Sequence, residues 1–175
     1  MNKPLLVKSV WFQLLWFLAV LGQESTQVWL VIAVVASVVF SYWQRDIHLR
    51  WLVGFVLCGI VLDSFNQYTG LFIFPTPWLP LWLLLLWGIF VWYAYQMRTI
   101  LTHFPKFIVC IVGALGAAGS YYAGLKFAAV HWPYSTVITL VIVFVEWFCL
   151  LTAMIYSLNV LQKQGKGLDH EQNSD

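Results

Sequence analysis

Charged residues are scarce in this sequence. Asp, Glu, Lys and Arg make up only 9% of its 175 residues, against about 25% in an average soluble protein. Nine basic and seven acidic side chains cannot solvate the surface of a soluble chain of this length. The net charge of +2 is too small and too scattered for nucleic-acid binding. The composition therefore excludes soluble, disordered and nucleic-acid-binding proteins, and it indicates a membrane protein.

Patterns of metal-binding and catalytic residues are also missing. Cys58, Cys110 and Cys149 lie inside apolar runs without a CxxC spacing, so they predict neither a disulfide framework nor a zinc site. We interpret them as small buried hydrophobic residues. The histidines are spread over different loops, and none of the common hydrolase or phosphate-binding motifs is present. The sequence therefore predicts no metal and no cofactor.

Long apolar runs dominate what is present. A membrane-spanning helix needs about 20 mostly apolar residues, and six segments qualify, roughly 5–22, 27–43, 51–68, 79–97, 107–124 and 135–158. The first run lacks a signal-peptide cleavage site before Gln23, so we expect it to be retained. Backbone groups in lipid must pair within their own segment, which makes these runs helices. The sequence predicts an all-α, polytopic transmembrane bundle of six helices over residues 1–161 and a polar, disordered cytoplasmic tail over 162–175.

Basic residues are divided unequally between the two sides of such a bundle. Only Lys126 falls on one side. The other side carries Lys3, Lys8, Arg45, Arg50, Arg98, Lys106, Lys163 and Lys166. The positive-inside rule therefore predicts that both termini are cytoplasmic. Tryptophans near the predicted helix ends favour anchoring at the membrane interface; they are Trp29, Trp43, Trp51, Trp78, Trp82 and Trp132.

Two carboxylates fall inside predicted spans and are the candidate catalytic residues. Asp63 lies toward the outer end of the third span, and Glu146 near the middle of the sixth. Ionisable groups at membrane depth cost about 2.5–3.5 kcal/mol on insertion scales, so a function is the default expectation. Glu146 is expected either to hydrogen-bond a neighbouring helix or to carry a proton or bind a polar headgroup. Asp63 is expected either to form an ion pair with Lys126 or to serve the site.

An outward-facing polar pocket is expected around Asp63, with Glu146 lying deeper. Its predicted lining is Asn66, Gln67, Tyr121, Tyr122, Lys126 and His131. The uncharged, proline-rich segment 69–80 is expected to lie over this face as a lid, to re-enter the membrane, or to act as an interfacial anchor. Small residues along the fifth span predict close packing of the third, fifth and sixth spans; they are Gly113, Gly116, Ala117, Ser120 and Gly124.

Several of these segments resemble a family of small bacterial inner-membrane proteins that is classed as a domain of unknown function. The resemblance covers about residues 10–160. Its most distinctive part is Phe74-Pro75 followed by Trp78-Leu79-Pro80-Leu81-Trp82, and it includes Gly59, Asp63-Ser64, Leu86-Trp87, 113–116, 120–124, 128–130 and Glu146-Trp147. It implies an inner-membrane location and brings no activity.

Three functions are compatible with these observations. The aromatic, proline-rich loop beside Asp63 favours a protein that handles or helps to modify a lipid or another hydrophobic substrate. The small-residue stripe favours a structural or assembly subunit of a membrane complex. The two intramembrane carboxylates favour a small proton-coupled transporter. The expected partners are the lipid bilayer and a membrane protein or a second copy of the chain, with no nucleic acid.

Overall fold

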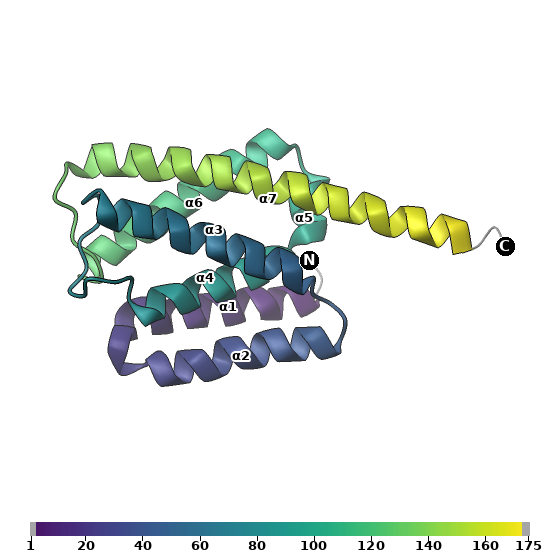
Figure 1. Cartoon of the computed structure of the whole chain (residues 1–175), viewed down its shortest axis with the longest axis horizontal. Helices are drawn as coiled ribbons and strands as arrows, with labels where there is room; N and C mark the ends of the chain where they lie inside the picture. Colours follow the sequence, from purple (N-terminus) through teal and green to yellow (C-terminus); the bar gives the residue numbers. More distant parts are fainter. Residues whose placement is uncertain (1–2, 173–175) are drawn as a thin grey trace.

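The computed structural model describes residues 3–172, which are almost entirely α-helical. Long helices lie side by side along one axis (Figure 1). They are α1 (Lys3–Gly22), α2 (Gln27–Trp43), α3 (Leu49–Tyr68), α4 (Leu81–Gln96), α6 (Lys106–Lys126) and α7 (Thr136–Gln172). The 3₁₀ turn η1 (Gln23–Ser25) links α1 to α2, and the short helix α5 (Arg98–His103) links α4 to α6. Over residues 3–172 no strand forms beyond one isolated bridge, Ile73 to His131, which confirms the all-α class.

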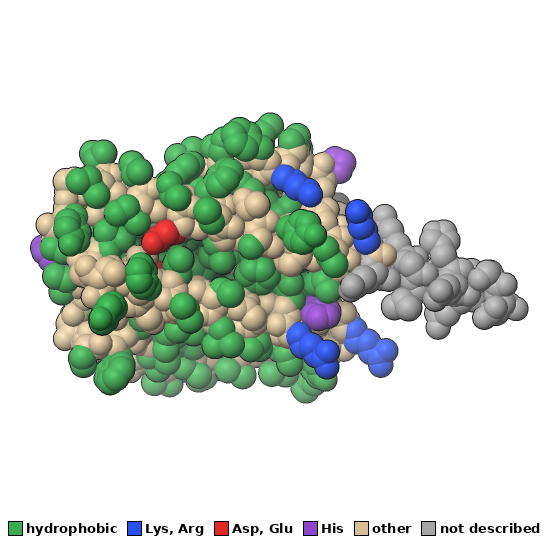
Figure 2. Space-filling model, turned by 45° about the horizontal axis from the view of Figure 1, so that its top comes forward, with side chains coloured by type: hydrophobic (Ala, Val, Ile, Leu, Met, Phe, Trp, Pro, Cys, Tyr) green, Lys and Arg blue, Asp and Glu red, His purple; other side chains and the backbone are tan. Residues whose placement is uncertain are grey.

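Consecutive long helices run in opposite directions. At one end, which we call the basic end, Asp46 in the α2–α3 loop accepts hydrogen bonds from Lys8 at 2.9 Å and Arg98 at 2.7 Å. At the other, the loop end, segment 69–80 meets the α6–α7 loop through the Ile73–His131 bridge. On the face drawn in Figure 2, Lys and Arg side chains gather at one end and hydrophobic side chains cover most of the remainder.

Four helical segments are long and apolar enough to cross a membrane: Lys3–Ser25, Leu49–Tyr68, Lys106–Lys126 and Thr136–Lys163. The other two predicted spans correspond to shorter apolar helices, α2 and α4. At 1.5 Å per residue, the 17 residues of α2 and the 16 of α4 cover only about 24–26 Å, less than the ~30 Å hydrocarbon core. Pro80 ends the irregular segment before α4 and caps that helix, so α4 is shorter than the apolar run that contains it.

The chain beyond residue 158 continues as helix. The sequence predicts disorder over 162–175, whereas α7 extends to Gln172. Residues 173–175 lie outside the described part of the chain.

Indole N–H groups tie the helices together. Trp11 donates to Ser37, Trp16 to Ser120, Trp51 to Ser157 and Trp92 to Ser41, each at 2.8–2.9 Å. Polar groups in lipid need partners within the protein, and each bond joins a different pair of helices. The interfacial anchoring predicted for tryptophan is wrong for Trp51, Trp82 and Trp132, because all three are buried inside the protein. Trp29, Trp43 and Trp78 are exposed, as anchoring requires.

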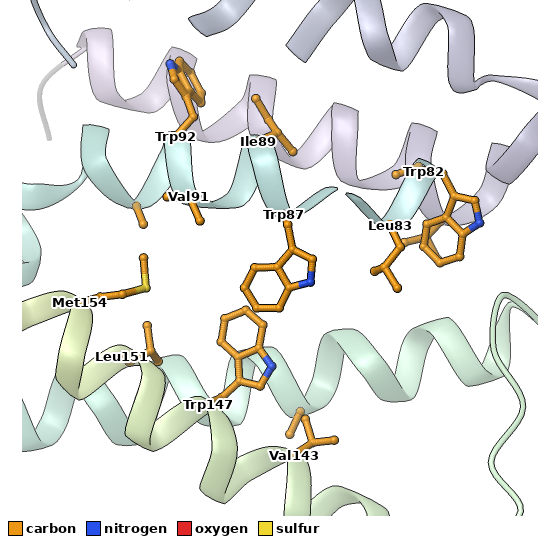
Figure 3. Close-up of a cluster of buried hydrophobic side chains, with 14 of the residues drawn as sticks. Trp82, Leu83, Trp87, Ile89, Val91, Trp92, Val143, Trp147, Leu151 and Met154 are labelled. Atoms are coloured by element: carbon orange, nitrogen blue, oxygen red, sulfur yellow. The ribbon is translucent and has the colours of Figure 1, made fainter. Parts of the chain in front are cut away.

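Helix α4 occupies the centre of the bundle and packs against α1, α2 and α3, whereas α6 packs mainly along α7. Aromatic and aliphatic side chains of α4 and α7 meet in the core, where Trp87 stacks on Trp147 with ring centroids 5.0 Å apart (Figure 3). Of the cysteines expected to be buried, only Cys110 is; Cys58 and Cys149 are exposed on the apolar helix surface. All three are free thiols.

Candidate functional site

Asp63 is completely buried and its carboxylate is fully engaged. Trp87 Nε1 donates to Oδ2 at 2.6 Å, and the Tyr121 hydroxyl donates to Oδ1 at 2.7 Å. We call these three residues, from α3, α4 and α6, the Asp63 cluster. The alternative of an ion pair with Lys126 is wrong, because neutral donors occupy both oxygens and the Lys126 ammonium lies 5.2 Å from the Tyr122 ring centroid.

Glycine makes this arrangement possible. Gly59 lies one helical turn before Asp63, and a methyl group added there would overlap the Trp87 ring. The absence of a side chain at Gly59 lets the indole lie flat against α3, where its N–H reaches the carboxylate. The four-residue spacing of Gly59 and Asp63 places them on one face of this helix, but nothing in the sequence identifies Trp87 as their partner.

Glu146 forms a second, separate polar contact. Its Oε2 accepts a hydrogen bond from Asn66 Nδ2 at 2.9 Å, which joins α7 to α3 and agrees with the alternative of bonding to a neighbouring helix. Asn66 lies nearer the loop end than Asp63 by about one helical turn. The greater depth of Glu146 stays a prediction.

Segment 69–80 covers the Asp63 cluster at the loop end. Phe72 is 1% exposed and stacks on Tyr121, with ring centroids 5.2 Å apart. Asn66 O accepts the backbone N–H groups of Leu71 and Phe72 at 2.8 and 3.2 Å, which fixes the turn that brings the loop inward. Among the lid, the re-entrant segment and the interfacial anchor, this position of segment 69–80 agrees with the lid over the Asp63 face.

The predicted pocket residues do not gather in one place. Gln67 donates to the Thr76 carbonyl and borders a shallow groove of about 510 Å³ at the loop end. His131 is exposed and pairs through its backbone with Ile73. Asn66 is buried against Glu146, whereas Tyr122 and Lys126 are exposed on α6. An outward-facing polar pocket around Asp63 is thus absent from the described part of the chain.

A second hollow is an apolar cavity of about 770 Å³, which we call the α1–α6 cavity. Its walls come from α1, α4, α5 and α6, and Trp147 and Leu151 of α7 close its back. Val112 is 63% exposed at its mouth. Tyr121 and Trp87 line it, and Asp63 lies behind them outside the lining.

The small residues of α6 belong to this cavity. All five, Gly113, Gly116, Ala117, Ser120 and Gly124, line its wall. Gly113 also lies against Leu151 of α7, as close packing requires, but a methyl group at Gly116 would meet no atom within 4 Å. Small residues on α6 therefore have two effects: at Gly113 they allow close contact with α7, and at Gly116 they leave open space in the cavity.

Metal ligands do not cluster. Among the described residues, no group of three or more His, Cys, Asp or Glu side chains could hold a metal ion.

Comparison with known protein families gives a match over most of the chain. Residues 5–153 match the family described as "Protein of unknown function (DUF2878)". The chain belongs to this family. The DUF2878 region contains the whole Asp63 cluster, Glu146 and all residues that line the α1–α6 cavity. We found no match among the curated proteins or the solved structures.

Sequence reasoning missed three features of this DUF2878 chain: Trp87, Trp16 and the cavity. Trp87 was one of many aromatic residues, and its role depends on contact with α3. Trp16 lines the cavity and donates to Ser120 at 2.8 Å, 104 positions further along the chain. The one available signal was the run of small residues on α6, which is compatible with close packing as well as with a cavity wall.

Proposed function

We propose that this chain is a six-span protein of the bacterial inner membrane, with cytoplasmic termini, that binds a lipid or another long hydrophobic molecule in the α1–α6 cavity. The observation that carries the proposal is the cavity, about 770 Å³ in volume and lined almost entirely by apolar side chains. Binding sites of about 300–1,000 Å³ with hydrophobic and aromatic walls are typical for small molecules.

The dimensions of the cavity favour an elongated occupant. Trp82 and Ala94 both line it, and their separation along α4 corresponds to a rise of about 18 Å. A hollow of this length is suited to an extended hydrocarbon chain. The cavity opens beside α6, where the lining side chains of Ile108 and Val112 are exposed and apolar. Placed in a bilayer, this mouth faces the lipid chains, so a lipid can enter sideways.

The arrangement of the helices supports the six-span topology. Six long helices alternate in direction, and α4, although short, is surrounded by α1, α2 and α3, so protein rather than lipid covers most of it. Lys8 and Arg98 lie at the basic end, which by the positive-inside rule faces the cytoplasm. Reporter fusions that are active only in the periplasm, placed after Tyr68 and after Trp43, test this topology. The proposal expects activity after Tyr68 and none after Trp43.

In this proposal Asp63 is a positioning residue. Its carboxylate holds the Trp87 indole and the Tyr121 hydroxyl, and the rings of both residues form part of the cavity wall. Asp63 therefore acts on a ligand through the two aromatic rings and does not contact the ligand itself.

Photolabelling tests the binding proposal. The protein is reconstituted in phosphatidylethanolamine–phosphatidylglycerol vesicles with a long-chain alkyl diazirine, and labelled residues are identified by mass spectrometry. We expect labels on the buried back wall, at Trp87 and Leu151, which are only 3% and 7% exposed, as well as on outer helix surfaces. Labels on the back wall distinguish cavity binding from contact with bulk lipid.

A matched pair of glycine variants supplies the control. Gly116→Leu places a side chain in the cavity, whereas Gly54→Leu places the same side chain on α3 outside it; neither glycine has an atom within 4 Å of the added carbon. Back-wall labelling is expected to disappear in Gly116→Leu and to persist in Gly54→Leu. Equal labelling in both variants, or labels on outer surfaces alone, would contradict the proposal and favour the assembly-subunit alternative.

A further inference from the structure

We infer that the α1–α6 cavity contains a polar subsite, formed by Gln13 and Ser120, that selects a neutral lipid carrying a hydroxyl or carbonyl oxygen. The inference rests on the proposed function, because it concerns the ligand of the same cavity.

Gln13 is the first component of the subsite. It lies near the middle of α1, where it is exposed and lines the cavity, yet within residues 3–172 its amide makes no side-chain hydrogen bond, unlike Ser9 and Trp11 on the same helix. Ser9 donates to the Leu5 carbonyl and accepts from Tyr93, and Trp11 donates to Ser37. An amide without a hydrogen-bond partner is costly in hydrocarbon. A ligand oxygen at this position would accept the missing hydrogen bond from the Gln13 amide.

Ser120 is the second component. Its oxygen accepts from Trp16 Nε1 at 2.8 Å, but its own hydrogen has no acceptor among the described residues. Ser37 and Ser157 each donate to a carbonyl of their own helix. Gln13 and Trp16 are three residues apart and therefore share a face of α1. The Trp16 bond therefore links Ser120 to the face of α1 that carries Gln13.

The remaining lining defines the charge of the ligand. None of the residues that line the cavity is Lys, Arg, His, Asp or Glu, so a phosphate or carboxylate placed inside would lack a counter-charge at a large desolvation cost. A hydroxyl or carbonyl oxygen needs only the one or two donors that Gln13 and Ser120 offer. The chemical class is thus a neutral long-chain lipid, such as a fatty alcohol or a diacylglycerol.

Competition against the photolabel tests the subsite. Unlabelled hexadecanol, hexadecane and hexadecyl phosphate are compared at equal mole fractions in the vesicles, and loss of label at Trp87 and Leu151 is measured. We expect hexadecanol to compete about fivefold better than hexadecane, the effect of one hydrogen bond. Hexadecyl phosphate is expected to compete no better than hexadecane.

Three variants locate the effect. Gln13→Leu and Ser120→Ala are each expected to reduce the advantage of hexadecanol while competition by hexadecane is unchanged. Gln13→Leu combined with Leu14→Gln keeps the composition of α1 but moves the amide to a residue outside the cavity lining, and it is expected to behave like Gln13→Leu alone.

The outcomes separate the two proposals. If hexadecanol and hexadecane compete equally in the wild type, the subsite is overturned and the cavity remains a binding site. An advantage that persists in Gln13→Leu and in Ser120→Ala also overturns the subsite. If no competitor reduces the label, or the back wall is never labelled, the proposed function fails and the subsite fails with it.

Discussion

The Asp63 cluster and the α1–α6 cavity share the rings of Trp87 and Tyr121 as a common wall. The polar groups on the two sides of this wall differ in whether they have hydrogen-bond partners. In the cluster, both carboxylate oxygens have a donor within 2.7 Å. On the cavity side, the Gln13 amide has no partner among the described residues, although it lies at the middle of a helix. Because lipid chains cannot supply hydrogen bonds, the buried carboxylate is paired within the fold, whereas the exposed, unpaired amide requires a partner from outside the chain. The comparison separates a structural cluster from a binding surface.

Removing the carboxylate is expected to have the largest effect on the structural side of this comparison. Asp63→Ala leaves the Trp87 N–H and the Tyr121 hydroxyl without acceptors, which should lower the free energy of unfolding by about 2–5 kcal/mol. Asp63→Asn retains one acceptor oxygen and should lose less. Denaturant titration of the purified protein in detergent micelles measures both. Wild-type stability in Asp63→Ala would show that the cluster does not stabilise the fold.

Crowding the same wall should have the next largest effect. Gly59→Ala forces the Trp87 ring away from α3, because the new methyl group would overlap it. Overpacking of this kind costs about 1–3 kcal/mol. Gly54→Ala on the same helix has no atom within 4 Å and should leave stability unchanged or raise it slightly, since alanine favours helices. Equal melting temperatures for the two variants would contradict the role given to Gly59.

The Trp16–Ser120 hydrogen bond across the cavity should contribute less to the free energy of unfolding than Asp63 or Gly59 does. Interhelical hydrogen bonds in membrane proteins average about 0.6 kcal/mol, so Trp16→Phe and Ser120→Ala should each have a small effect and the double variant should add little to either. A double-mutant cycle of unfolding free energies measures the coupling. Strictly additive effects would mean that the bond makes no net contribution.

The smallest effect is expected at the basic end, far from the shared wall. Burial raises the pKa of Asp46, but hydrogen bonds and charges of Arg98 and Lys8 outweigh it and hold the pKa below its ordinary value of 3.8. Stability from this group is present above that value and is lost as the pH falls through the lowered folded-state pKa. Because the side chain is 31% exposed, the contribution should be only about 0.2–0.5 kcal/mol. Melting curves between pH 7 and pH 3 should show a decline that Asp46→Asn reduces.

Local sequence patterns were sufficient for the helices but not for the site. Apolar runs predicted every long helix, and the spacing of Gly59, Asp63 and Asn66 corresponds to one face of a helix, which is buried in α3. What they could not give was the partner of each group, because Trp87 and Tyr121 reach Asp63 from helices whose packing is a property of the whole bundle. Abundant tryptophan was interpreted as interfacial anchoring. Serines at internal helix positions, such as Ser120 and Ser157, were the available sign of bonding between helices.

The sequence does not predict the cavity, for a related reason. A glycine signals that a side chain is absent, but it does not tell whether a neighbour or empty space lies beside it. Gly113 has Leu151 beside it, whereas Gly116, on the same helix, faces open space.

The central claim, that the cavity binds a long-chain lipid, is tested most directly by mass spectrometry of lipids that remain bound to the purified protein. The wild type and Gly54→Leu are predicted to retain a neutral lipid in nearly equimolar amount, and Gly116→Leu to lose it. Equal lipid content in all three proteins, or no bound lipid in any of them, would contradict the claim.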